Sequence, residues 1–202
     1  MHYPDFYTQV PPIKLYDPLS DFLGTFEKGE VEISYLDCVK LAGHSCPTVA
    51  GAYLMVQEGL RALYGEERPV RGSMKVEMKR NESEGVTGVT CNIISFILGA
   101  SGITGFKGIQ GNFSRNDLVF YSAPVPTELR LTRLDTKQSV NLSYDPSPVK
   151  TDEKMMPLMG KNLQGLASQE EQKMFHTLWQ ARVEKILLNR ELHSQLVTIT
   201  KD

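Results

Sequence analysis

The sequence predicts an α+β fold, in which a mixed or antiparallel sheet carries helices packed on one face and a long helix follows at the C-terminal end. Two helix-like segments come first, at residues 32–43 and 47–65. Strand-like segments follow at 118–124, 127–135 and 138–146, and the last two read as a hairpin. Helices followed by strands that return as hairpins favour separate layers over a doubly wound parallel sheet.

Glycine and proline mark the ends of the two early helices. Gly43 and Gly65 stand where helix C-terminal caps are expected, and Pro47 suits the first turn of the second helix. A strand is predicted around Met74–Met78, because apolar and charged residues alternate there. The first thirty residues are rich in proline and aromatics, and we expect them to wrap the surface.

The segment at 86–100 is ambiguous, because β-branched residues precede an apolar run. We expect a strand that gives way to a buried helix from about Cys91 to Leu98. The glycine-rich run at 101–117 then predicts an irregular loop.

A long amphipathic helix is expected from Ser168 to Leu196, with Ser168 and Glu171 as a capping box. A straight helix of that length would span about 43 Å, at about 1.5 Å per residue. Its apolar residues spread over more than one face, which favours a homodimer as the default assembly. The expected organisation is therefore an α+β domain at 1–150 and a helical extension at 151–202.

Composition limits the possible partners. The chain has 202 residues, 41% of them hydrophobic and 23% charged, which is ordinary for a globular protein. Its net charge of −2 gives no electrostatic footprint for nucleic acid or an anionic membrane. We expect neither a signal peptide nor a membrane span, and the odd number of three cysteines favours reduced thiols in the cytoplasm.

One histidine and two cysteines carry the strongest chemical signal. Cys46 precedes Pro47 at a helix start, where backbone N–H groups and the helix dipole favour a thiolate. His44 stands two residues earlier, and Cys91 falls at a second expected helix start. These three side chains would form a soft three-ligand site that suits zinc or another transition metal ion. The alternative is that the cysteines simply fill space in the core.

The remaining candidate residues carry weaker signals. Cys38 lies in an amphipathic helix and is expected in the core, and His176 is expected to face solvent or a partner. Lys107 and Arg115 lie within the glycine-rich loop and are candidates for binding an anionic ligand or cofactor. A tight crossover that only glycine can adopt is the alternative interpretation of that loop.

Two stretches, "AGHSCPTVAGAYLM" and "GVTCNIISFILGASGITGF", resemble the FmdE family of formylmethanofuran dehydrogenase components. The resemblance covers roughly residues 36–118, and it implies an α+β fold with a bound metal, usually zinc. His44, Cys46 and Cys91 match the metal-site positions of that family. The chain differs from many members at Ala42, where a further histidine is common, and it carries no cysteine after Cys91. It therefore resembles a stand-alone relative without the C-terminal zinc ribbon.

Three functions are compatible with these residues. The first is a cytoplasmic metal-binding accessory or carrier protein that serves a redox metalloenzyme. The second is a metal-dependent enzyme, which would need a base such as Glu77 or Glu84 beside the metal. The third is a module that binds haem or another metal cofactor, with His44 or Cys46 as an axial ligand. No residue pattern decides whether the chain is an enzyme.

Overall fold

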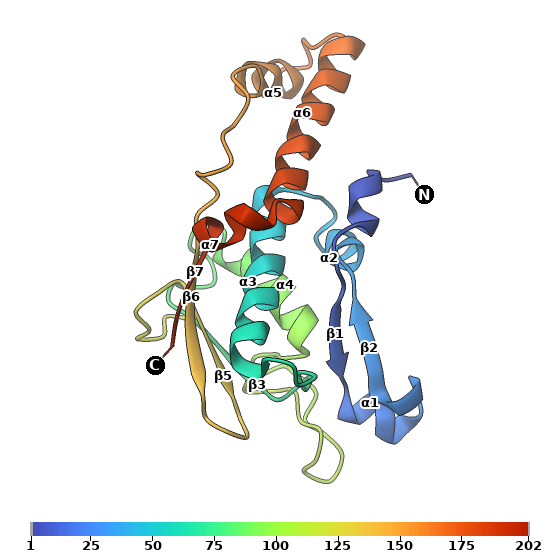
Figure 1. Ribbon diagram of the computed structural model, residues 1–202, viewed down its shortest axis with the longest axis vertical. Coiled ribbons are helices and arrows are strands. Elements are labelled where there is room, and N and C mark those ends of the chain that lie inside the picture. The colour runs from blue at the N-terminus through green and yellow to red at the C-terminus, as the bar shows by residue number, and fades with distance from the viewer. Residues whose placement is uncertain (1, 202) are drawn as a thin grey trace.

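The computed structural model describes residues 2–201, which form two sheets with helices between them (Figure 1). The strands are β1 (Ile13–Tyr16), β2 (Glu30–Ile33), β3 (Met74–Met78), β4 (Val119–Phe120), β5 (Leu129–Arg133), β6 (Ser139–Tyr144) and β7 (Val197–Lys201). The α-helices are α1 (Pro18–Leu23), α2 (Tyr35–Ala42), α3 (Pro47–Tyr64), α4 (Thr87–Leu98), α5 (Met155–Leu163), α6 (Gln169–Leu188) and α7 (His193–Leu196). Short 3₁₀ turns occur at η1 (Asp5–Thr8), η2 (Glu27–Gly29) and η3 (Arg190–Leu192).

The larger sheet has the strand order β4-β3-β5-β6-β7. Only the β3–β4 pair in it is parallel, and the others are antiparallel. Side chains of β3 and β5 alternate between buried and half-exposed, so one face of the sheet is covered. The helix α3 packs against β6 and β7 on that face (Figure 1). The expected α+β class is confirmed.

The N-terminal segment is part of the core, contrary to the expectation that it wraps the surface. β1 and β2 pair as an antiparallel hairpin, and Leu15 is almost fully buried. This hairpin lies on the side of the helices away from the five-stranded sheet (Figure 1). Alternating apolar residues in both strands supply the buried side, which the prolines and aromatics around them obscured in the sequence.

The helix α4 begins at Thr87, four residues before the expected start at Cys91. The expected strand before it is absent, and β-branched residues form the first helical turn. Thr90, Ile93, Ile94 and Ile97 are all buried. Burial at this helical spacing outweighs the small helix penalty of β-branched residues.

The C-terminal helix is shorter than expected, because α6 ends at Leu188 and not at Leu196. Its capping box of Ser168 and Glu171 is present as predicted. After α6 the chain turns through η3 and α7, and β7 then pairs with β6. The residues after 150 therefore contribute a sheet strand as well as helices, and β-branched residues in "VTIT" explain that strand.

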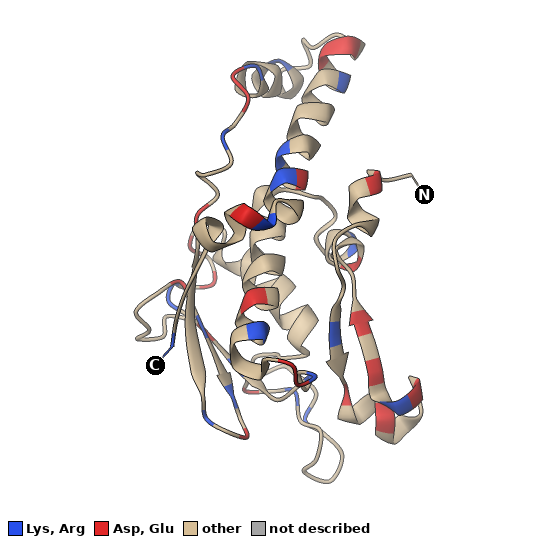
Figure 2. Ribbon diagram, in the orientation of Figure 1, with Lys and Arg blue, Asp and Glu red and all other residues tan. Residues whose placement is uncertain are grey.

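Two further features of the fold are a projecting pair of helices and a mixed distribution of charged residues. α5 and the first half of α6 extend away from the sheets as an arm (Figure 1). Figure 2 shows basic and acidic residues interspersed over most elements, while β2 and the neighbouring turns are mainly acidic. None of the described helices is long and apolar enough to cross a membrane.

Candidate functional site

The His-Ser-Cys stretch forms a short connection between α2 and α3. Gly43 ends α2 with a φ of +75°, a left-handed conformation that side chains rarely adopt. Cys46 is the N-terminal cap of α3, and its Sγ accepts a hydrogen bond from the backbone N–H of Val49 at 3.5 Å. Pro47 occupies the first turn. The predicted position of Cys46 at a helix start is confirmed.

His44 is exposed, yet a backbone contact orients its ring. Its Nδ1 lies 3.0 Å from the carbonyl oxygen of Ala42. A carbonyl oxygen only accepts, so Nδ1 must carry the hydrogen in this contact. In a neutral imidazole Nε2 then holds the free lone pair. This arrangement is the one found for metal-ligating histidines, whose second nitrogen donates to a carbonyl or carboxylate.

The helix α6 is hydrogen-bonded to the connection between α2 and α3. The indole Nε1 of Trp179 donates a hydrogen bond to the carbonyl oxygen of Ser45 at 2.8 Å. The hydroxyl of Ser45 lies 2.9 Å from the hydroxyl of the fully buried Tyr35. Ser45 therefore connects α6 to α2, and these contacts hold the backbone between His44 and Cys46 in place.

Two hollows meet at His44. The first, of about 470 Å³, is lined by His44, Ser45 and residues of α6 and the N-terminal segment, among them Pro4, Phe175, His176 and Trp179. The second, of about 310 Å³, lies toward α4 and is lined with His44 by Leu41, Val89, Asn92, Ile93 and Phe96. We name these the α6 hollow and the α4 hollow. Both are mainly apolar, and His44 is common to them.

Cys91 does not join this site, which corrects the expectation that it opens a helix beside His44. At about 100° per residue, the α4 side chains that line the α4 hollow share one face, and Cys91 lies on the opposite face. Its Sγ is 3.7 Å from the hydroxyl of Ser95 and also meets that of Tyr121. Burial raises the pKa of the Cys91 thiol, although these hydrogen bonds partly offset that effect. Cys91 is therefore a buried thiol, and burial outweighs the hydrogen bonds that would favour a thiolate.

Cys38 lies in the core, as predicted. It is fully buried in α2, and burial raises the pKa of its thiol to about 12. His176 is exposed on α6, but it lines the α6 hollow of its own chain. His176 and His44 therefore line one hollow of the same chain.

The set of His44, Cys46 and Cys91 does not fit a single metal ion. Among residues 2–201, no group of three or more histidine, cysteine, aspartate or glutamate side chains is placed to hold one ion. All three cysteines are free and buried. Of the three residues, only His44 and Cys46 belong to the same connection between α2 and α3. The His44 side chain is accessible, whereas Cys46 is buried and caps the helix.

Lys107 and Arg115 are not brought together. Lys107 is exposed, whereas Arg115 is buried and its guanidinium forms a 2.6 Å ion pair with Asp17. Arg71 binds the other oxygen of the same carboxylate at 3.0 Å. Asp17 also caps α1 through the N–H groups of Leu19 and Ser20. The loop that carries Arg115 therefore folds inward.

The structure adds Ser45, Trp179 and His176 to the residues that the sequence motif placed at the site. The signal that could have found Trp179 is its standing as the single tryptophan, on a predicted amphipathic helix. No family model matches the chain, and no curated protein matches it. The function of this site is consequently inferred from the geometry of its own residues.

Proposed function

We propose that this chain is an accessory or carrier protein for a metal, with His44 as the principal metal ligand. The observation that carries the proposal is the orientation of His44: its Nδ1 donates to the carbonyl oxygen of Ala42, which leaves the lone pair on Nε2, and the residue lines two apolar hollows. His176 lines one of these hollows and is the natural second ligand.

The geometry favours a metal that arrives inside an organic cofactor, such as haem, over a bare ion. A protein-bound zinc ion takes three or four protein ligands, and the described residues do not assemble three. A metal already held by a macrocycle needs only one or two axial ligands from the protein. The aromatic and aliphatic walls around His44 suit the apolar faces of such a cofactor.

Zinc remains the second candidate, supported by one feature of the motif. Cys46 follows His44 by two residues, and its Sγ already lies at the positive end of α3. A zinc site would need the Cys46 side chain to leave its capping position, and it would need further ligands from a partner or solvent. The proposed relationship to the FmdE family is the reason to test this form.

An enzymatic role has less support from the geometry. None of the residues that line the two hollows is a carboxylate. Glu84 is on the surface in an ion pair with Arg80, and Glu77 pairs with Lys75 on β3. Neither glutamate is placed as a base beside His44, so an accessory role toward a cytoplasmic redox metalloenzyme is the simpler proposal.

Titration with haemin and, separately, with Zn²⁺ tests the proposal. Trp179 is the single tryptophan and lines the α6 hollow, so a cofactor bound there must quench its fluorescence. We expect haemin to bind with one equivalent per chain, to quench this fluorescence, and to show the absorption of histidine-ligated iron. His44→Ala should weaken binding at least about tenfold, the effect of losing one good ligand contact.

The matched control is His193→Gln, which alters a histidine that contacts the Leu187 carbonyl and Glu58 outside both hollows. This variant should bind haemin like the parent chain. Equal binding by His44→Ala and the parent would refute His44 as the ligand. Stoichiometric Zn²⁺ binding without haemin binding would instead select the zinc form.

A further inference from the structure

A third hollow, of about 620 Å³, lies where α1, the C-terminal end of α4 and the glycine-rich loop meet. Arg71 and Arg115 line its floor together with Asp17. We propose that this hollow, named here the arginine hollow, binds a small organic anion: one carboxylate or phosphate group on an apolar body. The site is independent of the proposed metal function.

The floor of the arginine hollow carries an excess of positive charge. Two guanidinium groups share the single buried carboxylate of Asp17. Arg71 donates further hydrogen bonds to the carbonyl oxygens of Phe96 and Ile97, and Arg115 donates one to that of Gly99. Among the described residues, these bonds use about half of the N–H donors that two arginines possess. Donors therefore remain for an incoming anion.

The local backbone is shaped to admit the Arg115 guanidinium. A Cβ on Gly99 would collide with its terminal nitrogen, and a Cβ on Gly72 would approach its Nε to 2.7 Å. Both glycines also have positive φ values. Only glycine satisfies both conditions, so two positions maintain the space in which Arg115 reaches Asp17 and the floor of the hollow.

The rim of the arginine hollow is apolar and exposed. Leu23 of α1 is 58% exposed, and Phe106 of the glycine-rich loop is 47% exposed. Phe22, beside Leu23, packs against Phe113 of the same loop, with ring centroids 5.1 Å apart. Exposed apolar side chains gathered from two segments around a charged floor are a feature of ligand sites.

The surrounding surface indicates why the ligand needs an apolar body. The two glutamates of β2 are paired with basic residues, Glu30 with Arg68 and Glu32 with Lys14, so charges of both signs lie on this side of the molecule (Figure 2). Mixed charges of this kind add little long-range attraction for a free inorganic anion. Binding must then come from direct hydrogen bonds to the arginines together with contact at the apolar rim.

The fluorescent sulfonate 8-anilinonaphthalene-1-sulfonate, an aromatic anion, is the probe, and N-phenyl-1-naphthylamine is its uncharged analogue. We expect the sulfonate to bind at least about tenfold more tightly than the analogue, the effect of one charge-assisted hydrogen bond. Arg115→Gln should remove this preference. Phe106→Ala should weaken both probes, whereas Phe120→Ala, exposed on β4 outside the hollow, should weaken neither.

Asp17→Asn separates a binding role from a purely structural one. An asparagine keeps a side-chain oxygen to cap α1 and removes the negative charge from the floor. Binding of the sulfonate should then tighten severalfold. Weaker binding in a folded Asp17→Asn variant would overturn the proposal, as would equal affinity for the two probes in the parent. Should either floor variant fail to fold, as judged by near-ultraviolet circular dichroism, the Phe106→Ala and Phe120→Ala pair decides: equal affinities would place the probe elsewhere.

Discussion

The three cysteines differ in surroundings, and the sequence predicted the positions of Cys38 and Cys46 but not that of Cys91. Cys46 caps a helix, Cys91 meets Ser95 and Tyr121, and Cys38 is enclosed in the core. Only Cys46 lies beside the accessible His44. Cys46 is therefore the cysteine on which the zinc form of the proposal depends.

Cys38→Ala should leave the bound metal or cofactor unchanged and lower the free energy of unfolding by about 1 kcal/mol. Burial raises the folded-state pKa of Cys38 to about 12, above its unfolded value of about 8.5. The thiol therefore contributes stability that is complete below about pH 8.5 and is lost as the pH rises toward 12. Urea unfolding from about pH 7 to about pH 10 should show a shallower alkaline loss in the variant. Loss of bound metal in Cys38→Ala would show that this thiol is a ligand.

Substitutions of Gly51 and Gly59 in α3 should differ in their effect on stability. A Cβ on Gly51 would fall on the ring of Tyr144, whereas a Cβ on Gly59 would approach the methyl ends of two leucines, Leu131 at 3.0 Å and Leu142 at 3.3 Å. Gly51→Ala should destabilise the fold by about 1–3 kcal/mol, as overpacking does. Gly59→Ala should be near neutral, because the gain in helix propensity offsets the contact. Equal effects in thermal unfolding would show that Tyr144 yields easily.

Residue-level signals predicted local ends well and side-chain directions poorly. Gly43, Gly65, Pro47 and the Ser168 capping box act through the backbone of their own turn, so the sequence alone locates them. The direction of Cys91 depends on where α4 begins. Because α4 starts four residues earlier than expected, this thiol lies within the helix and not at its end.

At the scale of elements, tertiary pairing decided what local patterns left open. The β5–β6 hairpin was predictable, because each strand alternates and a short turn joins them. The end of α6 was not, since the residues after Leu188 become ordered by pairing with β6. The α6 hollow depends on that arrangement, because α6 must cross the motif for Trp179 to reach Ser45.

Trp179→Phe tests the contact between α6 and the motif. The variant keeps an aromatic wall but loses the 2.8 Å hydrogen bond to Ser45. We expect a loss of about 1 kcal/mol in the free energy of unfolding and weaker haemin binding, because the wall beside His44 is less firmly held. Tyr7→Phe, which removes the 3.1 Å bond to Gln180 of α6, is the control for a general loosening of that helix. Equal haemin affinity of the parent, Trp179→Phe and Tyr7→Phe would show that α6 does not contribute to the haemin site.

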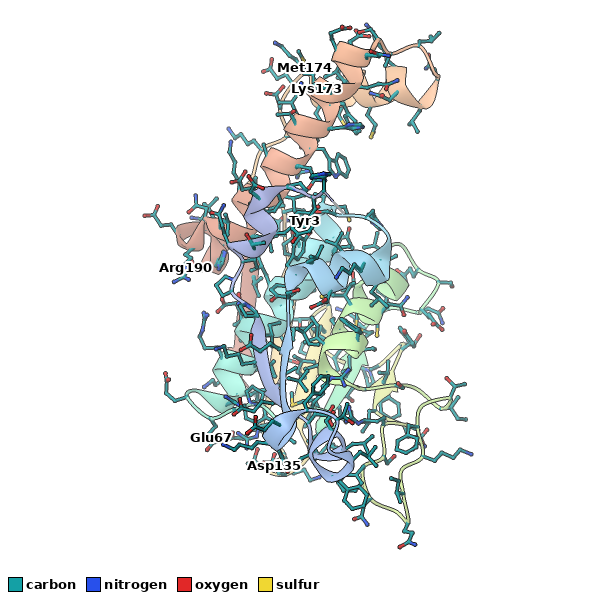
Figure 3. All side chains as sticks on the ribbon, turned by 90° about the vertical axis from the view of Figure 1, so that its right-hand side faces the viewer. Tyr3, Glu67, Asp135, Lys173, Met174 and Arg190 are labelled. Carbon is teal, nitrogen blue, oxygen red and sulfur yellow. The ribbon has the colours of Figure 1, made fainter. Side chains whose placement is uncertain are left out.

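At the scale of the whole molecule, the arm of α5 and α6 projects from the rest of the fold and does not cover its core. Figure 3 shows Lys173 and Met174 on the projecting part of α6, far from Glu67 and Asp135 at the other end. Three apolar residues of α6, Val183, Ile186 and Leu187, are buried within the chain and do not form a partner surface. Apolar side chains at the tip of the arm remain exposed, with Leu163 at 81% and Leu166 at 71%.

We propose that this tip joins two copies in a homodimer, and a light-scattering measurement tests it. The parent chain should have the mass of a dimer, and Leu163→Glu combined with Leu166→Glu should give a monomer, because charges at the tip oppose apolar contact. The core packing lies far from these positions, so thermal stability per chain should change little. A monomeric parent would remove the proposed dimer.

The proposed accessory function belongs to the scale of the whole molecule, since residues of α2, α4 and α6 line the two hollows that meet at His44. The most direct measurement is haemin titration of the parent chain and of His44→Ala, followed by Trp179 fluorescence and visible absorption. One equivalent bound by the parent, and at least about tenfold weaker binding by a folded His44→Ala, is the predicted result. Equal haemin affinity of the two proteins would contradict the account. So would a parent chain that binds neither haemin nor zinc.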